Sequence, residues 1–285
     1  MLKASDGVRL HVCESGQGEP MVFVHEFSGD QRSWDPQLAY FGRHAHCVTY
    51  AARGYLPSDV PASTAAYSQE RAADDVADVI RGLGLGAAHV VGLSMGGFAT
   101  LHFGLRHPQL AKSLVIAGCG YGAKPEQQPD YGQRMRAEAD HAENIGMAAF
   151  AAELAASPYA MPLRAKDSQG WSDFAAQLAG HSAQGTAMTL RAVLATRPSL
   201  WHLEDRLRRL QLPVLLLAGD EDDPCLEPNL YLKRTIPGAA WCVLPRTGHL
   251  ANLEDPAAFN QVIHDFVVAV DSGRWQGWTG HNFLA

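Results

Sequence analysis

The sequence predicts an α/β fold in which a mostly parallel sheet is covered by helices on both faces. Short apolar runs bounded by turn residues alternate with helical patterns through the first 120 residues, which is typical of parallel strands joined by helical crossovers. The alternation stops between residues 121 and 210 and then resumes. With 285 residues, 47% of them hydrophobic and 19% charged, the chain is long enough to bury a full core and is not a disordered polymer.

The predicted strands are short and apolar, as expected for strands buried on both faces. Between them, Ser68 is placed to cap a helix that runs to Leu83, and a second helix over residues 95–106 ends before His107-Pro108. The strands are expected at residues 8–13, 21–25, 46–50, 89–93, 114–117, 213–218 and 241–244.

Residues 121–210 are predicted to form a helical insertion. Its Ala-rich helical stretches are interrupted by three X-Pro pairs, which are Ser157-Pro158, Met161-Pro162 and Arg197-Pro198. We therefore expect a core built from residues 1–120 and 211–270, a helical segment between them, and a C-terminal tail over residues 271–285. The tail carries Trp275 and Trp278 and is compatible with either a packed or a disordered segment.

Composition and charge exclude several kinds of partner. The net charge is −7, and no basic run is interleaved with aromatic residues, so we expect no nucleic-acid partner. No stretch approaches the roughly 18 apolar residues of a membrane span, and the N-terminus lacks the apolar region of a signal peptide. We expect a cytoplasmic protein with no membrane partner, and a homo-oligomer stays compatible with the sequence.

The cysteines and the known ligand motifs predict neither disulfides nor a cofactor. The five cysteines are odd in number and contain no CxxC pair, and we expect them to act as small buried hydrophobic residues. The chain has no HExxH, Walker or EF-hand pattern, so we expect no metal and no nucleotide. A small-molecule substrate is the expected partner. The cysteines are Cys13, Cys47, Cys119, Cys225 and Cys242.

The sharpest local signal is a GxSxG sequence formed by Gly92, Ser94 and Gly96, between a predicted strand and a predicted helix. This context is typical of a nucleophile elbow, a strained turn that exposes a serine hydroxyl above the end of the sheet. The flanking glycines let neighbouring chain approach without Cβ clashes. Ser94 is therefore the candidate nucleophile.

A serine hydroxyl needs a general base, and the base needs a carboxylate that fixes its tautomer. The elbow order places acid and base after the serine in the chain. Acidic residues at positions 220–223 follow one predicted strand, and Gly248-His249 follows the next. Of the 13 histidines, His249 alone lies on a loop that follows a predicted strand and comes after these acidic residues, at the edge where ligands bind in open α/β sheets.

Up to about Val270, the sequence resembles capped serine hydrolases of the α/β-hydrolase fold superfamily. That family has a His-Gly-X oxyanion loop, an Arg-Gly turn and a GHxxxxExP segment. The corresponding residues here are His25-Glu26-Phe27, Arg53-Gly54, and Gly248-His249 with Glu254 and Pro256.

The resemblance also implies roles for single residues. The family acid stands three residues after a strand-ending glycine, which from Gly219 selects Asp222. Asp223 is the alternative acid, and Asp220 is expected to be structural. The resemblance further implies an oxyanion hole formed by the backbone N–H groups of Phe27 and Met95, and an insertion that serves as a cap.

Two residues depart from the family pattern. Ala51 stands where the family has an aspartate, and we expect this to affect local packing alone. Glu26 replaces the glycine of the oxyanion loop. We expect its charge to point away from the hole and to pair with Arg32 or Arg53, and the alternative is that Glu26 faces the substrate and binds a polar or cationic group.

The function expected from this resemblance is hydrolysis of a small carboxylic ester or lactone through an acyl-enzyme. A C–C bond hydrolase acting on ring-cleavage products, a non-turnover ligand receptor on the same fold, and acyl transfer or perhydrolysis are the alternatives. A dehalogenase is excluded, because that branch of the family has Asp where this chain has Ser94. Candidates for an apolar substrate pocket, each also compatible with a core role, are Tyr121, Met135, Met147, Phe150, Trp171, Met188 and Trp201.

Overall fold

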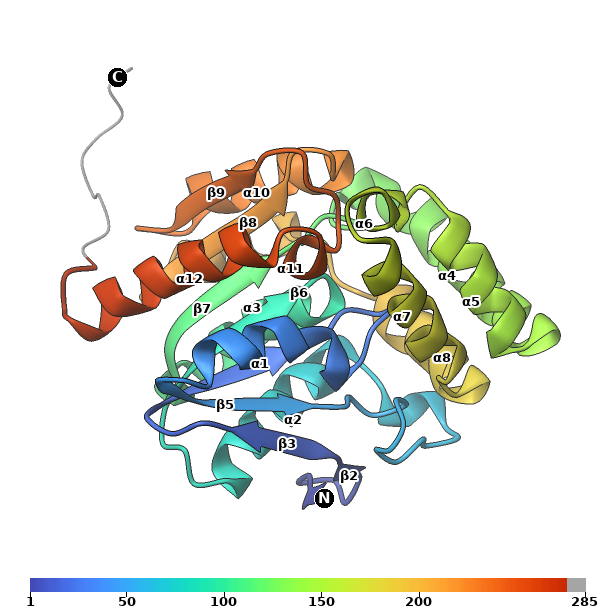
Figure 1. Cartoon of the computed structure of the whole chain (residues 1–285), viewed down its shortest axis with the longest axis horizontal. Coiled ribbons are helices and arrows are strands. Elements are labelled where there is room, and N and C mark those ends of the chain that lie inside the picture. The colour runs from blue at the N-terminus through green and yellow to red at the C-terminus, as the bar shows by residue number, and fades with distance from the viewer. Residues whose placement is uncertain (276–285) are drawn as a thin grey trace.

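The computed structural model describes residues 1–275, which form a mostly parallel sheet with helices on both faces (Figure 1). Within these residues the main sheet has seven strands in the order β3-β5-β4-β6-β7-β8-β9, and the edge strand β3 alone runs antiparallel to its neighbour. The strands are β3 (Val12–Ser15), β4 (Glu19–Val24), β5 (Ala45–Tyr50), β6 (Ala88–Leu93), β7 (Ala111–Ala117), β8 (Val214–Gly219) and β9 (Ala240–Leu244). The predicted fold class is confirmed.

Each central strand is buried on both faces, and β4 shows why. Val22 and Val24 pack into one core cluster, whereas Met21 and Phe23 pack into a second cluster on the opposite face. Successive side chains of a strand point to opposite faces, so a continuous apolar run serves two layers of helices at once.

The helices of the core form the two outer layers. Helices α2 (Gln69–Gly82), α3 (Met95–Arg106) and α10 (Asp223–Thr235) contribute to the first cluster or contact the strands there. Helices α1 (Asp35–Phe41) and α12 (Pro256–Asp271) supply aromatic side chains to the second cluster. Ser68 caps α2 by accepting a hydrogen bond from the N–H of Arg71, as predicted.

The predicted strand over residues 8–13 is wrong as a single element. It divides into β2 (Arg9–Leu10), which pairs with β1 (Leu2–Lys3) in a separate small sheet, and β3 of the main sheet. The division falls at His11, whose backbone N–H donates to the Ser58 hydroxyl at 2.7 Å instead of to a neighbouring strand. An apolar pattern alone does not reveal such a switch of partner.

Between β7 and β8 the described chain forms helices and loops and no strand, and the helices within residues 128–189 lie together at one end of the sheet (Figure 1). Pro158 separates α5 from α6, but Pro162 lies in the first turn of α6 and so begins a helix instead of breaking one. The main helical elements of this segment are α4 (Gln128–Ile145), α5 (Met147–Ala156), α6 (Met161–Lys166), α7 (Ser168–Ala179), α8 (Ala183–Thr189), the π-helix η5 (Leu190–Leu194), η6 (Trp201–Leu203) and α9 (Glu204–Leu207).

Three further predictions concern the chain end, the membrane and the cysteines. Trp275 packs edge-on against Phe266, with ring centroids 4.6 Å apart, whereas Trp278 lies outside the described residues. Within residues 1–275 no helix is both long and apolar enough to cross a membrane. All five cysteines are free thiols, three of them buried and two half-buried.

Candidate active site

Ser94 lies on the sharp turn between β6 and α3. Its backbone has φ 55° and ψ −114°, which a residue with a Cβ rarely adopts. The turn is anchored by a hydrogen bond from the Ser94 N–H to the carbonyl of Ala117 at 2.8 Å. A Cβ on Gly92 would lie 2.2 Å from the Gly96 carbonyl oxygen, and one on Gly96 would lie 2.0 Å from that of Val24. Both glycines are therefore needed for the close approach of the chain.

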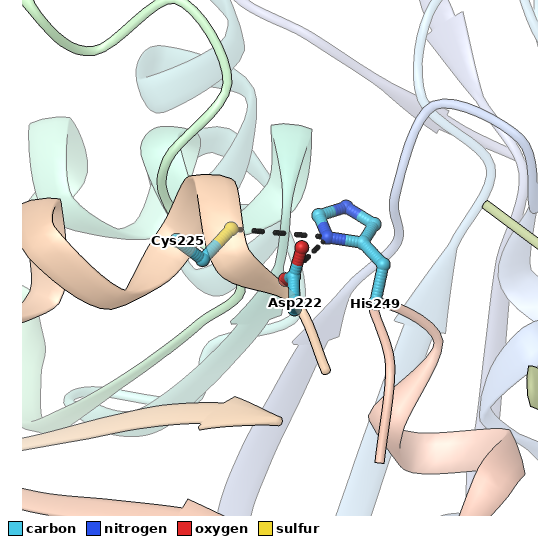
Figure 2. A group of neighbouring side chains, drawn as sticks. All are labelled: Asp222, Cys225 and His249. Carbon is cyan, nitrogen blue, oxygen red and sulfur yellow. Dashed lines mark hydrogen bonds and ion pairs between the residues drawn. The ribbon is translucent and has the colours of Figure 1, made fainter. Parts of the chain in front are cut away.

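His249 and Asp222 lie on the loops that follow β9 and β8. His249 Nδ1 is 2.7 Å from Asp222 Oδ2, and both side chains are buried (Figure 2). The other acidic residues of the loop do not share this contact: Asp223 is exposed at the start of α10, and Asp220 accepts a hydrogen bond from the Thr247 N–H. Asp222 is thus the carboxylate that contacts the histidine.

Glu254 holds the loop that carries His249. Its two carboxylate oxygens accept hydrogen bonds from the backbone N–H groups on either side of the histidine, Gly248 at 2.5 Å and Leu250 at 3.0 Å. Glu254 lies in α11 (Ala251–Glu254), immediately after this loop. The GHxxxxExP spacing therefore has a physical reason, because the glutamate fixes the orientation of the histidine backbone.

Cys225 is the third side chain at this point, with its Sγ 3.9 Å from His249 Nδ1 (Figure 2). Cys225 was predicted only as a small buried hydrophobic residue. The carboxylate, thiol and imidazole atoms of Asp222, Cys225 and His249 that could bind a metal ion lie within 4.8 Å of one another. Burial, however, raises the pKa of the Cys225 thiol well above its ordinary value, which disfavours the thiolate that binds metals. At 2.7 Å, His249 Nδ1 and Asp222 Oδ2 are at the distance of a direct hydrogen bond.

Two tyrosines contact the imidazole of His249. The Tyr121 ring meets it edge-on with centroids 4.9 Å apart, and the Tyr159 ring lies 5.0 Å away. The Tyr159 hydroxyl shares a hydrogen bond of 2.7 Å with Ser28 Oγ, which links the helical segment to the loop after β4. Tyr159 was not predicted at the site, because a tyrosine among helix-breaking residues carries no distinguishing signal.

A cavity of about 290 Å³ joins these groups, since Ser94 and His249 both line it. Between Ser94 Oγ and the imidazole the structure has no hydrogen bond, a contact that in ligand-free enzymes often tightens when substrate binds. Phe27 also borders the cavity, and the remaining wall comes from helices and loops of the inserted segment, residues 121–210. Of the predicted pocket residues, Tyr121, Met135 and Phe150 line it.

The other predicted pocket residues lie elsewhere, so the assignments of Trp171 and Trp201 to the substrate site are wrong. Trp171 donates its indole N–H to the Ala155 carbonyl and packs inside the helical segment. Trp201 stacks on Tyr231 with ring centroids 4.2 Å apart, against the core of the sheet. Met147 and Met188 do not line the cavity either, although they pack in the apolar clusters that contain its lining residues Phe150 and Leu194.

The two expected oxyanion donors lie close to this cavity. Met95 is the first residue of α3 and directly follows Ser94, and Phe27 lies on the loop after β4. The Phe27 carbonyl accepts a hydrogen bond from the Tyr55 hydroxyl at 2.9 Å, which helps to hold the backbone of this loop in place. Within residues 1–275 neither the Phe27 nor the Met95 N–H donates to another protein group, so both are available to a ligand.

The expected pairing of Glu26 with an arginine is wrong. Arg32 pairs with Asp30 at 2.5 Å, and Arg53 pairs with Asp75 at 2.7 Å and with Asp6 at 2.8 Å. These carboxylates lie closer to the two guanidinium groups than Glu26 does. Glu26 is also absent from the cavity lining, so its assignment as a substrate-binding residue is not supported.

Glu26 is instead fully buried beneath the loop. Ser33 Oγ donates to its Oε1 at 3.2 Å, and its Oε2 has no hydrogen-bond partner among the described residues. Burial raises the pKa of the Glu26 carboxyl to about 7. Burial also opposes the charge of the neighbouring Asp30, but hydrogen bonds from His181 and Arg32 outweigh it and hold the Asp30 pKa below its usual range. Two nearby carboxyls therefore differ strongly in acidity.

A serine on a strained turn, a histidine and an acid on loops at strand ends, and a cavity above them are together typical of hydrolases built on a mostly parallel sheet. Within that class, the chain belongs to the alpha/beta hydrolase family, whose sequence model matches residues 21–262. This bears out the resemblance stated from the motifs.

Individual relatives and solved structures are similar over nearly the whole chain. The 3-oxoadipate enol-lactonase 1 of Acinetobacter baylyi (strain ATCC 33305 / BD413 / ADP1) is 27% identical over 88% of this chain and 89% of that protein. A hydrolase from Pseudomonas aeruginosa PA01 is 26% identical, with a TM-score of 0.81 over 93% of this chain and 97% of that one. A thermophilic esterase from Thermogutta terrifontis, at 24% identity and a TM-score of 0.84 over 94% and 97% of the two chains, shares the fold.

Proposed function

We propose that this hydrolase cleaves small carboxylic esters or lactones through an acyl-enzyme formed on Ser94. The observation that carries the proposal is the buried contact of 2.7 Å between His249 Nδ1 and Asp222 Oδ2 beside a cavity that also holds Ser94. A carboxylate bound to one imidazole nitrogen leaves the other free to accept a proton from a serine hydroxyl. The similarity to an enol-lactonase over most of both chains supports an ester or lactone as substrate.

The proposed reaction has two halves. In the first, Ser94 Oγ attacks the substrate carbonyl while His249 accepts the hydroxyl proton, and Asp222 stabilises the imidazolium that forms. The N–H groups of Phe27 and Met95 would bind the developing oxyanion, a contribution of about 3 kcal/mol per donor in comparable sites. His249 then returns the proton to the leaving alcohol, and the same residues activate water to release the acid.

Labelling and turnover together test the proposal. A fluorophosphonate probe should add one adduct per chain, located on the Ser94 peptide by mass spectrometry, and Ser94→Ala should remain unlabelled. A chain-length series of methyl esters and lactones, followed by acid release, should show steady turnover by the wild type.

Three results would contradict the proposal in different ways. A single burst of product without steady turnover would indicate a ligand receptor, whereas turnover of vinylogous diketones with no ester hydrolysis would indicate a C–C bond hydrolase. Labelling of a residue other than Ser94 would remove the nucleophile assignment.

A further inference from the structure

The cavity above Ser94 is mostly aromatic and aliphatic, but three charged side chains also line it. These are Arg134, Glu138 and Arg197. The cavity lining thus holds two positive charges and one negative charge, whereas the net charge of the whole chain is −7. The sign of charge in the cavity is therefore opposite to that of the molecule as a whole.

Arg197 is a buried cation without a carboxylate partner. Arg197 lies in the loop after η5, and 5% of the residue is exposed. The guanidinium lies 3.9 Å above the centre of the Phe98 ring, and its Nη1 donates to the Tyr121 carbonyl at 2.9 Å. Its buried Nε has no acceptor, and no carboxylate lies within ion-pair distance of Arg197 among residues 1–275.

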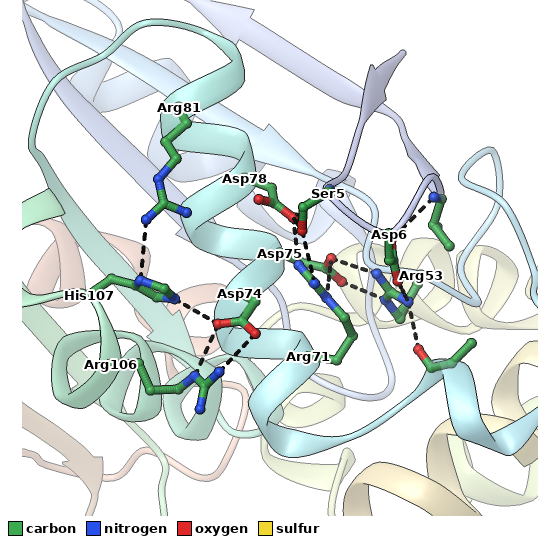
Figure 3. Close-up of polar contacts among 12 residues, drawn as sticks. Ser5, Asp6, Arg53, Arg71, Asp74, Asp75, Asp78, Arg81, Arg106 and His107 are labelled. Atoms are coloured by element: carbon green, nitrogen blue, oxygen red, sulfur yellow. Dashed lines mark hydrogen bonds and ion pairs between the residues drawn. The ribbon is translucent and has the colours of Figure 1, made fainter.

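Arg53 shows how the same chain treats another buried arginine. It is 4% exposed, close to the value for Arg197, but its guanidinium binds Asp75 through two nitrogens and Asp6 through a third contact (Figure 3). Burial of an arginine is thus balanced by two carboxylates at one place and by none at the other. The difference is that Arg197 borders the cavity and Arg53 does not border it.

An unpaired buried charge is costly, because the lost hydration must be replaced. The rings of Phe98 and Tyr131 replace part of it, since aromatic faces attract cations. The fork of N–H donors remains incompletely used, and such a fork matches a carboxylate through two parallel hydrogen bonds. Because Arg197 lines the cavity, a carboxylate inside it would supply an acceptor to the N–H groups that the guanidinium presents there.

Arg134 adds a second positive charge near the entrance. It is exposed, lies on α4, and is placed 5.5 Å from the centre of the Tyr131 ring. An exposed cation at a cavity mouth raises the local concentration of anions and so favours their entry. Glu138 lies one helical turn further along α4 and acts in the opposite sense. A cationic substrate therefore belongs in the test.

We propose that the ester or lactone hydrolysed at Ser94 carries a carboxylate, and that Arg197 binds this carboxylate inside the cavity. This inference rests on the proposed function and specifies its substrate class. A cavity of about 290 Å³ holds a molecule of the order of ten non-hydrogen atoms, so the substrate is a small acid ester with its charge a few bonds from the reacting carbonyl.

Three methyl esters of similar length test the proposal by acid release in a pH-stat. They are monomethyl glutarate, which is anionic, methyl glutaramate, which is neutral, and methyl 4-(trimethylammonio)butanoate, which is cationic. We expect wild-type kcat/KM to be at least tenfold higher for the anionic ester than for the neutral one. Arg197→Gln should lower kcat/KM for the anionic ester about thirtyfold or more and leave the neutral ester within threefold, while Arg197→Lys should fall between. Arg209→Gln, an exposed arginine away from the cavity, is the matched control.

A binding measurement keeps the proposal testable if Arg197→Gln does not fold. Glutarate, and not glutaramide, should slow fluorophosphonate labelling of wild-type Ser94, and Arg134→Gln should weaken this protection.

The outcomes separate the two proposals. A wild type that hydrolyses the neutral or cationic ester at least as well as the anionic one overturns the carboxylate site and leaves the proposed function standing. Equal losses on all three esters in Arg197→Gln would also overturn it, because they would mean that Arg197 serves only to hold Tyr121. Absence of turnover on every ester, with glutarate still protecting Ser94, would contradict the proposed function and support the anion site.

Discussion

The two walls of the cavity are built by different kinds of structure. One wall consists of loops at strand ends, where Ser94, Asp222 and His249 are fixed by backbone hydrogen bonds and short polar contacts. The other consists of inserted helices, which meet the cavity through side chains such as Phe150 and Leu194. Positions on the first wall follow from the sheet, whereas those on the second depend on how each helix packs. We therefore expect changes in the first wall to affect the rate of chemistry and changes in the second to affect selection among substrates.

The largest expected effect concerns the first wall alone. Ser94→Ala and His249→Ala should each lower kcat for ester hydrolysis by about a thousandfold or more, because the two residues act as one unit. For the same reason the double variant should be little worse than either single variant. Steady-state kinetics, with circular dichroism to verify folding, measure this. Losses that multiply in the double variant would contradict a shared role.

The next prediction compares two neighbouring aspartates, of which only Asp222 contacts His249. Asp222→Asn should lower kcat by about a thousandfold or more, because the amide no longer holds the required tautomer of His249. Asp223→Asn removes the same charge one residue away, at an exposed position, and should keep kcat within about twofold. Similar mild effects in both variants would place the acid elsewhere.

The third prediction concerns Glu26, whose burial beneath the first wall should lower the free energy of unfolding near neutral pH. Its pKa is raised from 4.5 to about 7 by burial, so the folded chain holds a proton that the unfolded chain releases between these values. Stability from this group is present below pH 4.5 and is lost as the pH rises to about 7. Glu26→Gln cannot ionise and should gain up to about 3 kcal/mol relative to wild type over this range.

Urea unfolding of both proteins from pH 4.5 to 8 measures the difference. Glu126→Gln, which alters an exposed carboxylate, should show a nearly constant difference from wild type. If the Glu26→Gln difference were also constant with pH, Glu26 would not take up a proton on folding.

Substitutions in the second wall should change the selection among substrates, and this is the smallest of the four expected effects. Phe150→Ala enlarges the cavity and should shift the kcat/KM ratio of hexanoate to acetate esters about tenfold toward hexanoate, through the apolar area the longer chain can bury. Trp201→Phe alters an aromatic residue of the same segment that lies outside the cavity, and should leave the ratio within about twofold. A ratio that responds equally to both would mean that the helices do not form the pocket.

The predicted site residues that the structure brings together belong to the first wall. Ser94, Asp222 and His249 each follow a parallel strand, and parallel strands end at one edge of a sheet, so the chain order alone brings these residues near one another. Trp171 and Trp201 were misplaced because the rotation of a helix about its axis depends on its neighbours, and Ala-rich sequence gives little periodicity to fix it.

Polar contacts over long sequence distances were the second weakness. The prediction that Glu26 pairs with Arg32 or Arg53 failed because each arginine has carboxylates nearer in space. Arg197 was noticed only as a residue before proline. Nothing in its local sequence distinguishes a buried arginine from an exposed one, since burial here results from the packing of the guanidinium itself against Phe98 and Tyr131, which are distant in the sequence.

The backbone at Ser94 has a consequence for the descendants of this chain. A serine held at φ 55° and ψ −114° strains the fold by roughly 1 to 3 kcal/mol, and glycine would relieve most of this strain. Selection for stability alone therefore favours the loss of the serine, and Ser94→Gly should unfold at higher urea than Ser94→Ala.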